Sequence, residues 1–321
     1  MNLNVVSFLD PQVYNGGGEM ISRRLIDVGV GRGHDIRVSS VRPKKKALHA
    51  SPNLTLLIDV FNFAHSIKSL GAWREFEPRF LESMIERAPF VHLTNAYVDV
   101  CNLPYLPCSG ERLDGCPVKP TLNVVKRFMI RDWSDDCFAR RAFVHRLYEA
   151  SALNVYLSPL HRRVTESLLG SKQLPPSYLL KPMIDTKAFS NEQRDRDIDY
   201  LFVGVIGEAK GLAAMRERFG QTDIHLIGRC APGIKPDFGR HLGHVSYDEV
   251  PRYMNRAKNF VFLPRWPEPQ GRVVAEAALC GCRIIGNENV GALSFDMDLA
   301  DSRSYEGVED EFWTRLEELA R

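Results

Sequence analysis

One pattern occurs twice along this chain: short apolar runs alternate with amphipathic stretches, and each series starts with a strand. Residues 3–9 (LNVVSFL) are an apolar run that predicts a strand, and residues 10–18 (DPQVYNGGG) have the composition of a turn. Residues 19–29 then carry apolar side chains at helical spacing, before a second strand at residues 36–39. A β-α-β unit of this kind begins a doubly wound parallel sheet.

Both series continue with the same alternation. In the first series the apolar runs predict strands at residues 54–60, 90–93 and 154–157, with amphipathic helices between them, one at 145–152. The pattern restarts after Pro182, with strands at 199–205, 224–227, 260–264 and 283–286 and helices at 209–219, 246–257 and 272–280. The sequence therefore predicts an α/β protein with two Rossmann-like β/α/β lobes that face a central cleft.

The length of 321 residues suits two domains. We expect an N-terminal domain over residues 1–182 and a C-terminal domain over residues 183–304. Residues 310–321 (DEFWTRLEELAR) predict an amphipathic terminal helix, and we expect the segment 305–321 to pack back on the N-terminal domain.

Composition excludes several classes of protein. Hydrophobic content of 44% with 26% charged residues excludes a mainly disordered chain. The sequence has no run of eighteen apolar residues that predicts a spanning helix, and Asp10 interrupts the amino terminus where a signal peptide would stay apolar. Seven cysteines, an odd number at low density, do not predict a disulfide scaffold. These features predict a cytoplasmic protein with reduced thiols.

Charge is unevenly distributed between the two halves. Residues 1–182 carry 24 Lys+Arg and 17 Asp+Glu, a net charge of +7, whereas residues 183–321 carry 18 and 23, a net charge of −5. The basic residues of the first half include Lys126-Arg127 and Arg140-Arg141, the latter near aromatic residues. Such a surface suits lipid headgroups at the inner membrane face or a nucleic acid, and equally an ordinary solvated surface.

The most informative stretch is residues 264–281 (PRWPEPQGRVVAEAALCG). Two carboxylates, Glu268 and Glu276, stand eight residues apart, and a turn between them precedes a helix that starts at Arg272. The N-terminus of such a helix can offer backbone N–H groups and a positive dipole to a phosphate or a sugar hydroxyl. Paired glutamates at this spacing also occur on ordinary helices whose carboxylates face water.

The order of residues around this pair resembles the E-x7-E signature of retaining GT-B glycosyltransferases of the family-4 type. In that family a strand is followed by a proline-rich turn, the first Glu, a Gly, the second Glu, "EA" and "CG", and this chain has all of these features in the same order. The resemblance extends along the whole chain. It includes residues 15–19 (NGGGE), 33–35 (GHD), 178–189 (YLLKPMIDTKAF), 201–211 (LFVGVIGEAKG), 225–228 (HLIG) and 243–245 (GHV). It departs at Pro182-Met183, where the family usually has Asn-Gly.

The resemblance implies roles for the E-x7-E stretch. Glu276 is expected to bind the ribose hydroxyls of the donor nucleotide, and Glu268 is expected to act in catalysis by contacting hydroxyls of the transferred sugar. The backbone of Gln270, Gly271 and Arg272 is expected to hold that sugar and the diphosphate.

The resemblance also implies cations and glycines around the donor phosphates. Lys210 is expected to stabilise the charge that develops on the leaving diphosphate. Gly17 and Gly18 of the first loop, and Gly204 after a strand, are expected to let backbone approach the donor. The alternative for Lys210 is a surface lysine, and for the glycine loop a plain tight turn.

One departure concerns the diphosphate. The family usually has Arg directly after the glycine at position 204, and this chain has Val205. Arg265, Arg272 or Arg229 could supply the second cation, because each lies close to a predicted strand end that faces the cleft. We expect Arg265 to take part in donor binding. The other interpretation is weakened or lost catalysis.

His92 lies near the end of the predicted strand 90–93 and resembles an acceptor-side histidine of the family, although a packed histidine is equally compatible. The cysteines Cys101, Cys108, Cys116 and Cys137 lack a C-x-x-C pair, so we expect an acceptor-binding loop without metal. The resemblance implies no cofactor and no metal ion.

We therefore expect a metal-independent hexosyltransferase of polysaccharide biosynthesis that transfers a sugar with retention from a nucleotide-diphospho-sugar to a glycan or glycolipid. Alternatives are a transferase acting on a modified nucleic acid base, a weakly catalytic sugar-nucleotide-binding subunit and a nucleotide-sugar epimerase. The E-x7-E turn disfavours the epimerase.

Overall fold

The computed structural model describes residues 1–14, 16–43, 45, 47–60, 78–87, 89–101, 106, 108, 139, 142–170 and 173–321. The chain divides into two compact units. Unit 1 comprises residues 1–156, 162–180 and 309–321, and unit 2 comprises residues 157–161 and 181–308. The boundary predicted from the sequence lies after residue 182.

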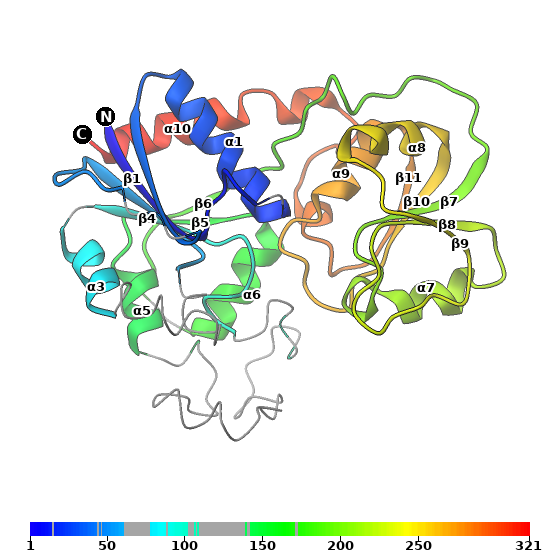
Figure 1. Ribbon diagram of the computed structural model, residues 1–321, viewed down its shortest axis with the longest axis horizontal. Helices are drawn as coiled ribbons and strands as arrows, with labels where there is room; N and C mark the ends of the chain where they lie inside the picture. Colours follow the sequence, from blue (N-terminus) through cyan, green and yellow to red (C-terminus); the bar gives the residue numbers. More distant parts are fainter. Residues whose placement is uncertain are drawn as a thin grey trace. The chain divides into compact units, whose positions relative to one another are not determined.

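Unit 1 is built on a parallel sheet with the strand order β2-β1-β3-β4-β5-β6 (Figure 1). Its strands are β1 (Asn2–Leu9), β2 (Asp35–Arg42), β3 (Leu54–Ile58), β4 (Phe90–Leu93), β5 (Leu153–Tyr156) and β6 (Ser177–Leu179). Its helices are α1 (Gly17–Gly31), α3 (Pro78–Arg87), α5 (Ala142–Glu149) and most of α6 (Pro159–Leu169). The central strands β1, β3, β4 and β5 are almost fully buried, which is why they appear in the sequence as continuous apolar runs.

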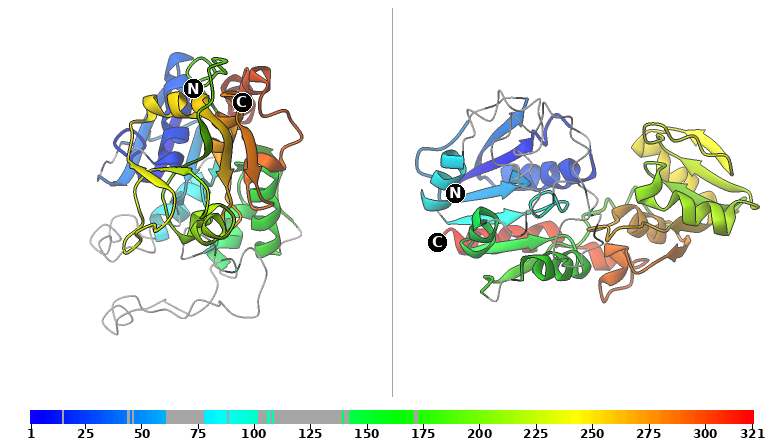
Figure 2. Two further views of the ribbon diagram at one scale, coloured as in Figure 1. Left: turned by 90° about the vertical axis from the view of Figure 1, so that its right-hand side faces the viewer. Right: turned by 90° about the horizontal axis from the view of Figure 1, so that it is seen from below.

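The C-terminal helix α10 (Val308–Leu319), red in Figures 1 and 2, packs against α1 of unit 1 through ion pairs such as Arg24–Glu309. Trp313 is almost fully buried and donates a hydrogen bond from Nε1 to the carbonyl of Leu25, at 2.9 Å. Gly29 makes room for this ring, since a Cβ there would lie 2.0 Å from Trp313 Cζ2. The end of the chain is therefore part of the unit 1 core.

Unit 2 contains a second parallel sheet, with the order β11-β10-β7-β8-β9. Its strands are β7 (Ile198–Val203), β8 (Ile224–Ile227), β9 (Arg240–Gly243), β10 (Ala257–Phe262) and β11 (Arg283–Gly286). Its helices are α7 (Leu212–Phe219), α8 (Val250–Arg256) and α9 (Arg272–Leu279), with short 3-10 turns η4 (Glu208–Lys210), η5 (Tyr247–Glu249), η6 (Gly291–Ser294) and η7 (Ser302–Tyr305). The predicted α/β class with two parallel sheets is confirmed.

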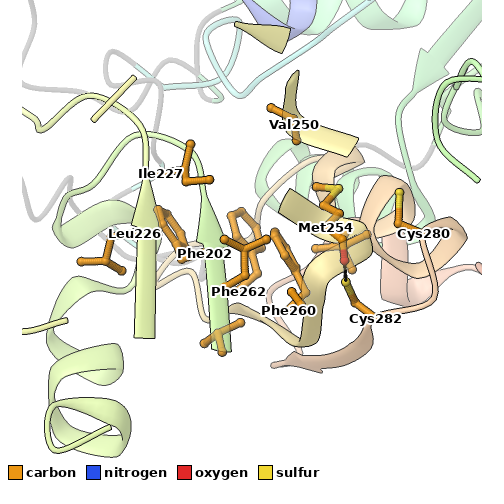
Figure 3. Packing of buried hydrophobic residues seen from close by; sticks show 14 of the residues in the cluster. Phe202, Leu226, Ile227, Val250, Met254, Phe260, Phe262, Cys280 and Cys282 are labelled. Atoms are coloured by element: carbon orange, nitrogen blue, oxygen red, sulfur yellow. Dashed lines mark hydrogen bonds between the residues drawn. The ribbon is translucent and has the colours of Figure 1, made fainter. Parts of the chain in front are cut away.

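The core of unit 2 joins the sheet to the helices on it. Phe202 of β7 and Phe262 of β10 stack with ring centroids 6.2 Å apart (Figure 3). Met254 of α8 packs over these strands, and its carbonyl accepts a hydrogen bond from Cys282 Sγ at 3.1 Å. Cys280 and Cys282 are thus buried packing residues beside α9. No helix among the described residues combines the length and the apolar character needed to cross a membrane.

Candidate functional site

The carboxyl ends of the parallel strands in unit 2 meet at one edge of the sheet, where ligands bind in folds of this class. The loops after β7 and β8 contact each other at this edge, and Gly204 and Gly228 allow the close approach of the two backbones. Gly204 N donates to the carbonyl of Ile227 at 2.9 Å, and a Cβ on Gly228 would lie 1.8 Å from the Gly204 carbonyl oxygen. The next residue, Val205, is 53% exposed, so the position where the resemblance expects Arg carries a solvent-facing apolar side chain.

Lys210 and Glu268 form an ion pair at this edge. Lys210 Nζ lies 2.5 Å from Glu268 Oε2, and it also lies 5.4 Å from the centre of the Trp266 ring. Gly211 makes the approach of η4 to the sheet possible, because its φ is +91° and a Cβ would lie 1.9 Å from the Leu263 carbonyl oxygen. A positive and a negative group are therefore held together, with an aromatic ring beside the ammonium group.

Backbone hydrogen bonds fix the loop that carries Glu268. Glu268 N donates to the carbonyl of Asn289 at 2.7 Å, and Gly291 N donates to the carbonyl of Glu268 at 3.0 Å. Asn287 and Asn289 each donate a side-chain hydrogen bond to the Pro264 carbonyl, at 3.0 and 3.1 Å. These hydrogen bonds fix the turn from which the Glu268 carboxylate projects. The carboxylate is therefore preorganised, because its position is set before a ligand binds.

The turn before α9 is held by the segment at residues 157–158. Gln270 is buried and donates from Nε2 to the Leu157 carbonyl at 3.2 Å, while Ser158 Oγ donates to the Pro269 carbonyl at 2.5 Å. Gly271 is the N-cap of α9 with φ +68°. A residue with a Cβ is strained in this conformation, so glycine lets the chain turn directly into the helix.

Glu276, one turn into α9, is a buried carboxylate with 2% of its surface exposed. Tyr247 donates its hydroxyl to Glu276 Oε1 at 2.7 Å, and Arg272 Nε lies 2.9 Å from the same oxygen. Burial raises the pKa of Glu276, whereas Arg272 and the Tyr247 hydroxyl act in the opposite direction. Desolvation raises the pKa of Tyr247, and the negative charge of the Glu276 carboxylate raises it further.

Four of the predicted site residues thus form two contacting pairs within unit 2, Lys210 with Glu268 and Arg272 with Glu276. Arg265 is exposed, and its guanidinium lies 3.9 Å from the Glu208 carboxylate. Sequence reasoning missed Tyr247. The Ser246–Glu249 capping box predicts a helix start there, but nothing in the sequence indicates that the tyrosine reaches α9.

The predicted glycines of unit 1 differ in their surroundings. A Cβ on Gly18 would lie 2.8 Å from Asn95 Cβ, so Gly18 allows a close approach of α1 to the end of β4. A Cβ on Gly17 would meet no described atom within 4 Å, so packing among the described residues does not require glycine there. Asn15 lies outside the described residues.

His92 lies in β4 with no exposed side-chain surface. Its Nε2 is 2.9 Å from Asp99 Oδ2, and the Asp99 side chain is equally buried. Tyr148 packs edge-on against the imidazole at 4.5 Å. The structure therefore places His92 in a buried histidine–carboxylate pair rather than at a surface, and its contact with a substrate stays a prediction.

Cys116 and Cys137 lie outside the described residues, as do Lys126, Arg127, Arg140 and Arg141. Within the part of the chain that the structure describes, no three His, Cys, Asp or Glu side chains are grouped as ligands for a metal ion.

No protein-family model matches the chain, and no curated protein matches its sequence. Solved structures that are similar over its full length include the following three. Anabaena HepE in complex with UDP has a TM-score of 0.56 at 13% identity, with 100% of this chain and 92% of that chain covered. Lipopolysaccharide outer core galactosyltransferase WaaB has a TM-score of 0.53 at 11% identity, with 100% and 90% covered. An alpha-glucosyltransferase in complex with UDP-glucose and DNA containing an abasic site has a TM-score of 0.51 at 11% identity, again with 100% and 90% covered. At these identities the likeness shows the fold: this chain has the two-unit α/β architecture of these proteins.

Proposed function

We propose that this chain is a glycosyltransferase that moves a sugar from a nucleotide-diphospho-sugar to a hydroxyl acceptor. The observation that carries the proposal is the buried, oriented carboxylate of Glu276 at the edge of a parallel sheet that also presents the Lys210–Glu268 pair. A buried carboxylate is costly unless hydrogen-bond donors meet it, and the vicinal diol of a ribose supplies two. The fold shared with nucleotide-bound structures supports the same assignment.

Each group then has a chemical task. Glu276 accepts hydrogen bonds from the ribose, and Glu268 accepts hydrogen bonds from hydroxyls of the transferred sugar. Lys210 supplies positive charge to the diphosphate, and the backbone at residues 270–272 offers N–H groups at the start of α9. Binding of the donor therefore requires the Lys210–Glu268 contact to lengthen, so that each partner meets the donor instead.

In the transfer step the acceptor oxygen forms a bond to the anomeric carbon while the bond from that carbon to the diphosphate oxygen breaks. The acceptor proton passes to the leaving diphosphate, so a nucleoside diphosphate is released and no protein base is needed. Lys210 lowers the barrier by stabilising the negative charge that grows on the leaving group. We propose transfer with retention and without a metal ion on the basis of the family-4 resemblance.

We further propose a uridine donor and a glycan or glycolipid acceptor. The similarity to HepE with UDP and to a glucosyltransferase with UDP-glucose supports uridine, and the similarity to a lipopolysaccharide galactosyltransferase supports the acceptor class. The DNA bound to the glucosyltransferase keeps a nucleic acid acceptor as the second candidate. A cytoplasmic protein with a peripheral contact at the inner membrane face fits the basic residues of the first half.

The test is a calorimetric titration with UDP, GDP, ADP and UDP-glucose. A ligand that binds only the folded state also raises the melting temperature, so a thermal melt gives an independent check. We expect selective binding of one nucleotide diphosphate. Glu276→Ala should weaken that binding by about tenfold or more, through loss of hydrogen bonds to a charged acceptor. Unchanged affinity in Glu276→Ala would remove the ribose assignment, and no binding by the wild-type protein would overturn the proposed function.

The exposed Val205 side chain favours one further candidate, a protein that binds a sugar nucleotide without turning it over. This candidate predicts nucleotide binding with no release of nucleoside diphosphate from UDP-glucose when acceptor extracts are added. Product release would exclude it.

A further inference from the structure

The Glu276 carboxylate uses its two oxygens unequally. Tyr247 donates to Oε1 at 2.7 Å and Arg272 Nε lies 2.9 Å from the same atom. No described residue donates a hydrogen bond to Oε2. Because each carboxylate oxygen has about two acceptor sites, two donors fill Oε1 and leave Oε2 with its full capacity.

Tyr247 is held in place by rings and charge on either side. The buried Phe189 packs against it at 5.4 Å between centroids, and the Arg272 guanidinium lies 5.4 Å from the centre of its ring. Its position in η5 follows a capping box in which Ser246 and Glu249 bond each other. Even so, 43% of its surface is exposed. Its ring is therefore ordered by contacts that do not involve the hydroxyl, while the residue remains next to solvent.

We propose that Tyr247 is a positioning residue for the nucleotide: its hydroxyl, together with Arg272, occupies Glu276 Oε1 and thereby aims Oε2 at a vicinal diol of a ribose. This inference rests on the proposed function. Oε2 offers two acceptor sites on one atom, which suits two neighbouring hydroxyl groups that donate in the same direction. Tyr247 does not touch the reacting atoms, and it acts only through the carboxylate.

The same contact affects the charge of Glu276. The ionisable groups around the carboxylate are Arg272 and Tyr247, with Tyr305 and Cys280 also within electrostatic reach, and Asp185 near the tyrosine. Burial raises the pKa of Glu276 and the Tyr247 hydroxyl lowers it, so removing the hydroxyl raises that pKa further. A protonated carboxyl group loses acceptor capacity, so nucleotide affinity should fall as pH drops through this pKa, and the fall should begin at higher pH without the hydroxyl.

The experiment compares Tyr247→Phe with Tyr200→Phe, which removes a hydroxyl from β7 and leaves the Glu276 contacts intact. Calorimetry measures the affinities for UDP and for 2′-deoxy-UDP between pH 5 and pH 8. NMR spectroscopy measures the chemical shift of the Glu276 carboxyl carbon in the ligand-free protein over the same pH range. Phe keeps the ring contacts with Phe189 and Arg272, so Tyr247→Phe should fold. We expect Tyr247→Phe to lose about tenfold in UDP affinity, to discriminate less against 2′-deoxy-UDP and to titrate Glu276 at higher pH. Tyr200→Phe should match the wild-type protein.

Each outcome has one meaning. If the wild-type protein binds UDP and Tyr247→Phe binds it equally, with the same pH dependence, the inference is wrong and the proposed function stands. If Tyr200→Phe weakens binding as much as Tyr247→Phe does, the hydroxyl has no specific role and the inference is again overturned. If the wild-type protein binds no nucleotide, the proposed function fails and the ligand assignment fails with it. In that case an unchanged carboxyl titration in Tyr247→Phe would also refute the effect on Glu276.

Discussion

Lys210 Nζ lies 2.5 Å from Glu268 Oε2, although the two residues are 58 positions apart in the sequence. Lys210 ends the η4 turn after β7, and Glu268 lies in the loop between β10 and α9. The two strands are neighbours in the sheet, so their carboxyl ends bring the pair together. The ion pair thus marks the point where the loops of the two strands converge.

Replacing Lys210 by Met should lower the turnover of the donor more than its binding. Met keeps much of the lysine stem beside Trp266 but removes the charge that stabilises the leaving diphosphate. We expect a loss of about 100-fold in the rate of nucleoside diphosphate release from UDP-glucose. The matched control is Lys258→Met, which removes an exposed lysine from its ion pair with Asp199. A Lys210→Met protein with the wild-type rate would rule out Lys210 as the stabilising cation.

Arginine at position 205 tests whether the chain lacks a necessary cation. The Val205 side chain is exposed, so we expect Val205→Arg to change the free energy of unfolding by no more than about 0.5 kcal/mol. If the existing cations suffice, turnover of UDP-glucose should change little. A gain of about tenfold or more, the effect of one hydrogen bond to a charged group, would instead indicate that the natural protein is a weak catalyst.

Asp59 should make the stability of the protein depend on pH. Its backbone has a φ of +49°. Burial raises its pKa to about 8, and the negative charges of Asp99 and, less strongly, Glu19 add to this increase. Hydrogen bonds from Asn95 act in the opposite direction. The folded state therefore holds a proton that the unfolded chain releases near pH 4.

This difference in proton binding determines how the free energy of unfolding changes with pH. The stabilisation from protonated Asp59 is complete below about pH 4, falls as pH rises and is lost above about pH 8. Asp59→Asn, which suits the positive φ, should remove this contribution to the pH dependence of urea unfolding. The control is Asp27→Asn on the exposed face of α1, which should unfold like the wild-type protein. An unchanged pH dependence in Asp59→Asn would contradict the raised pKa.

The contact between α1 and α10 should contribute strongly to the stability of unit 1. Trp313→Ala removes a buried indole and its hydrogen bond to Leu25, so we expect a loss of about 3–5 kcal/mol in the free energy of unfolding. Gly29→Ala should also destabilise, by about 1–3 kcal/mol, because its Cβ would overlap the indole. Chemical denaturation measures both. Gly31→Ala is the control, since a Cβ there would meet no described atom within 4 Å; an equal effect of the two glycine substitutions would exclude overpacking.

Most of the elements could be predicted because each depends on a local pattern. The strands at residues 90–93, 224–227 and 283–286 have the predicted bounds, since each coincides with a short run that is mainly apolar. The predicted helix at 209–219 is divided in the structure: Gly211 adopts a positive φ and separates η4 from α7. The edge strands β6 and β9 were not predicted, because β6 is short and only half-buried and β9 is mostly exposed, so neither leaves an apolar run.

The sequence alone determined the alternation of strands and helices, and from it the two parallel sheets. It also determined that Glu268 and Glu276 flank the start of one helix, because all of these are relations between near neighbours. Only the tertiary structure decided that the Tyr247 hydroxyl reaches Glu276, and that His92 is buried against Asp99. Those contacts depend on how strands order in a sheet and how helices pack on it. Many residues distant in sequence fix that packing together, and no spacing between single residues reveals it.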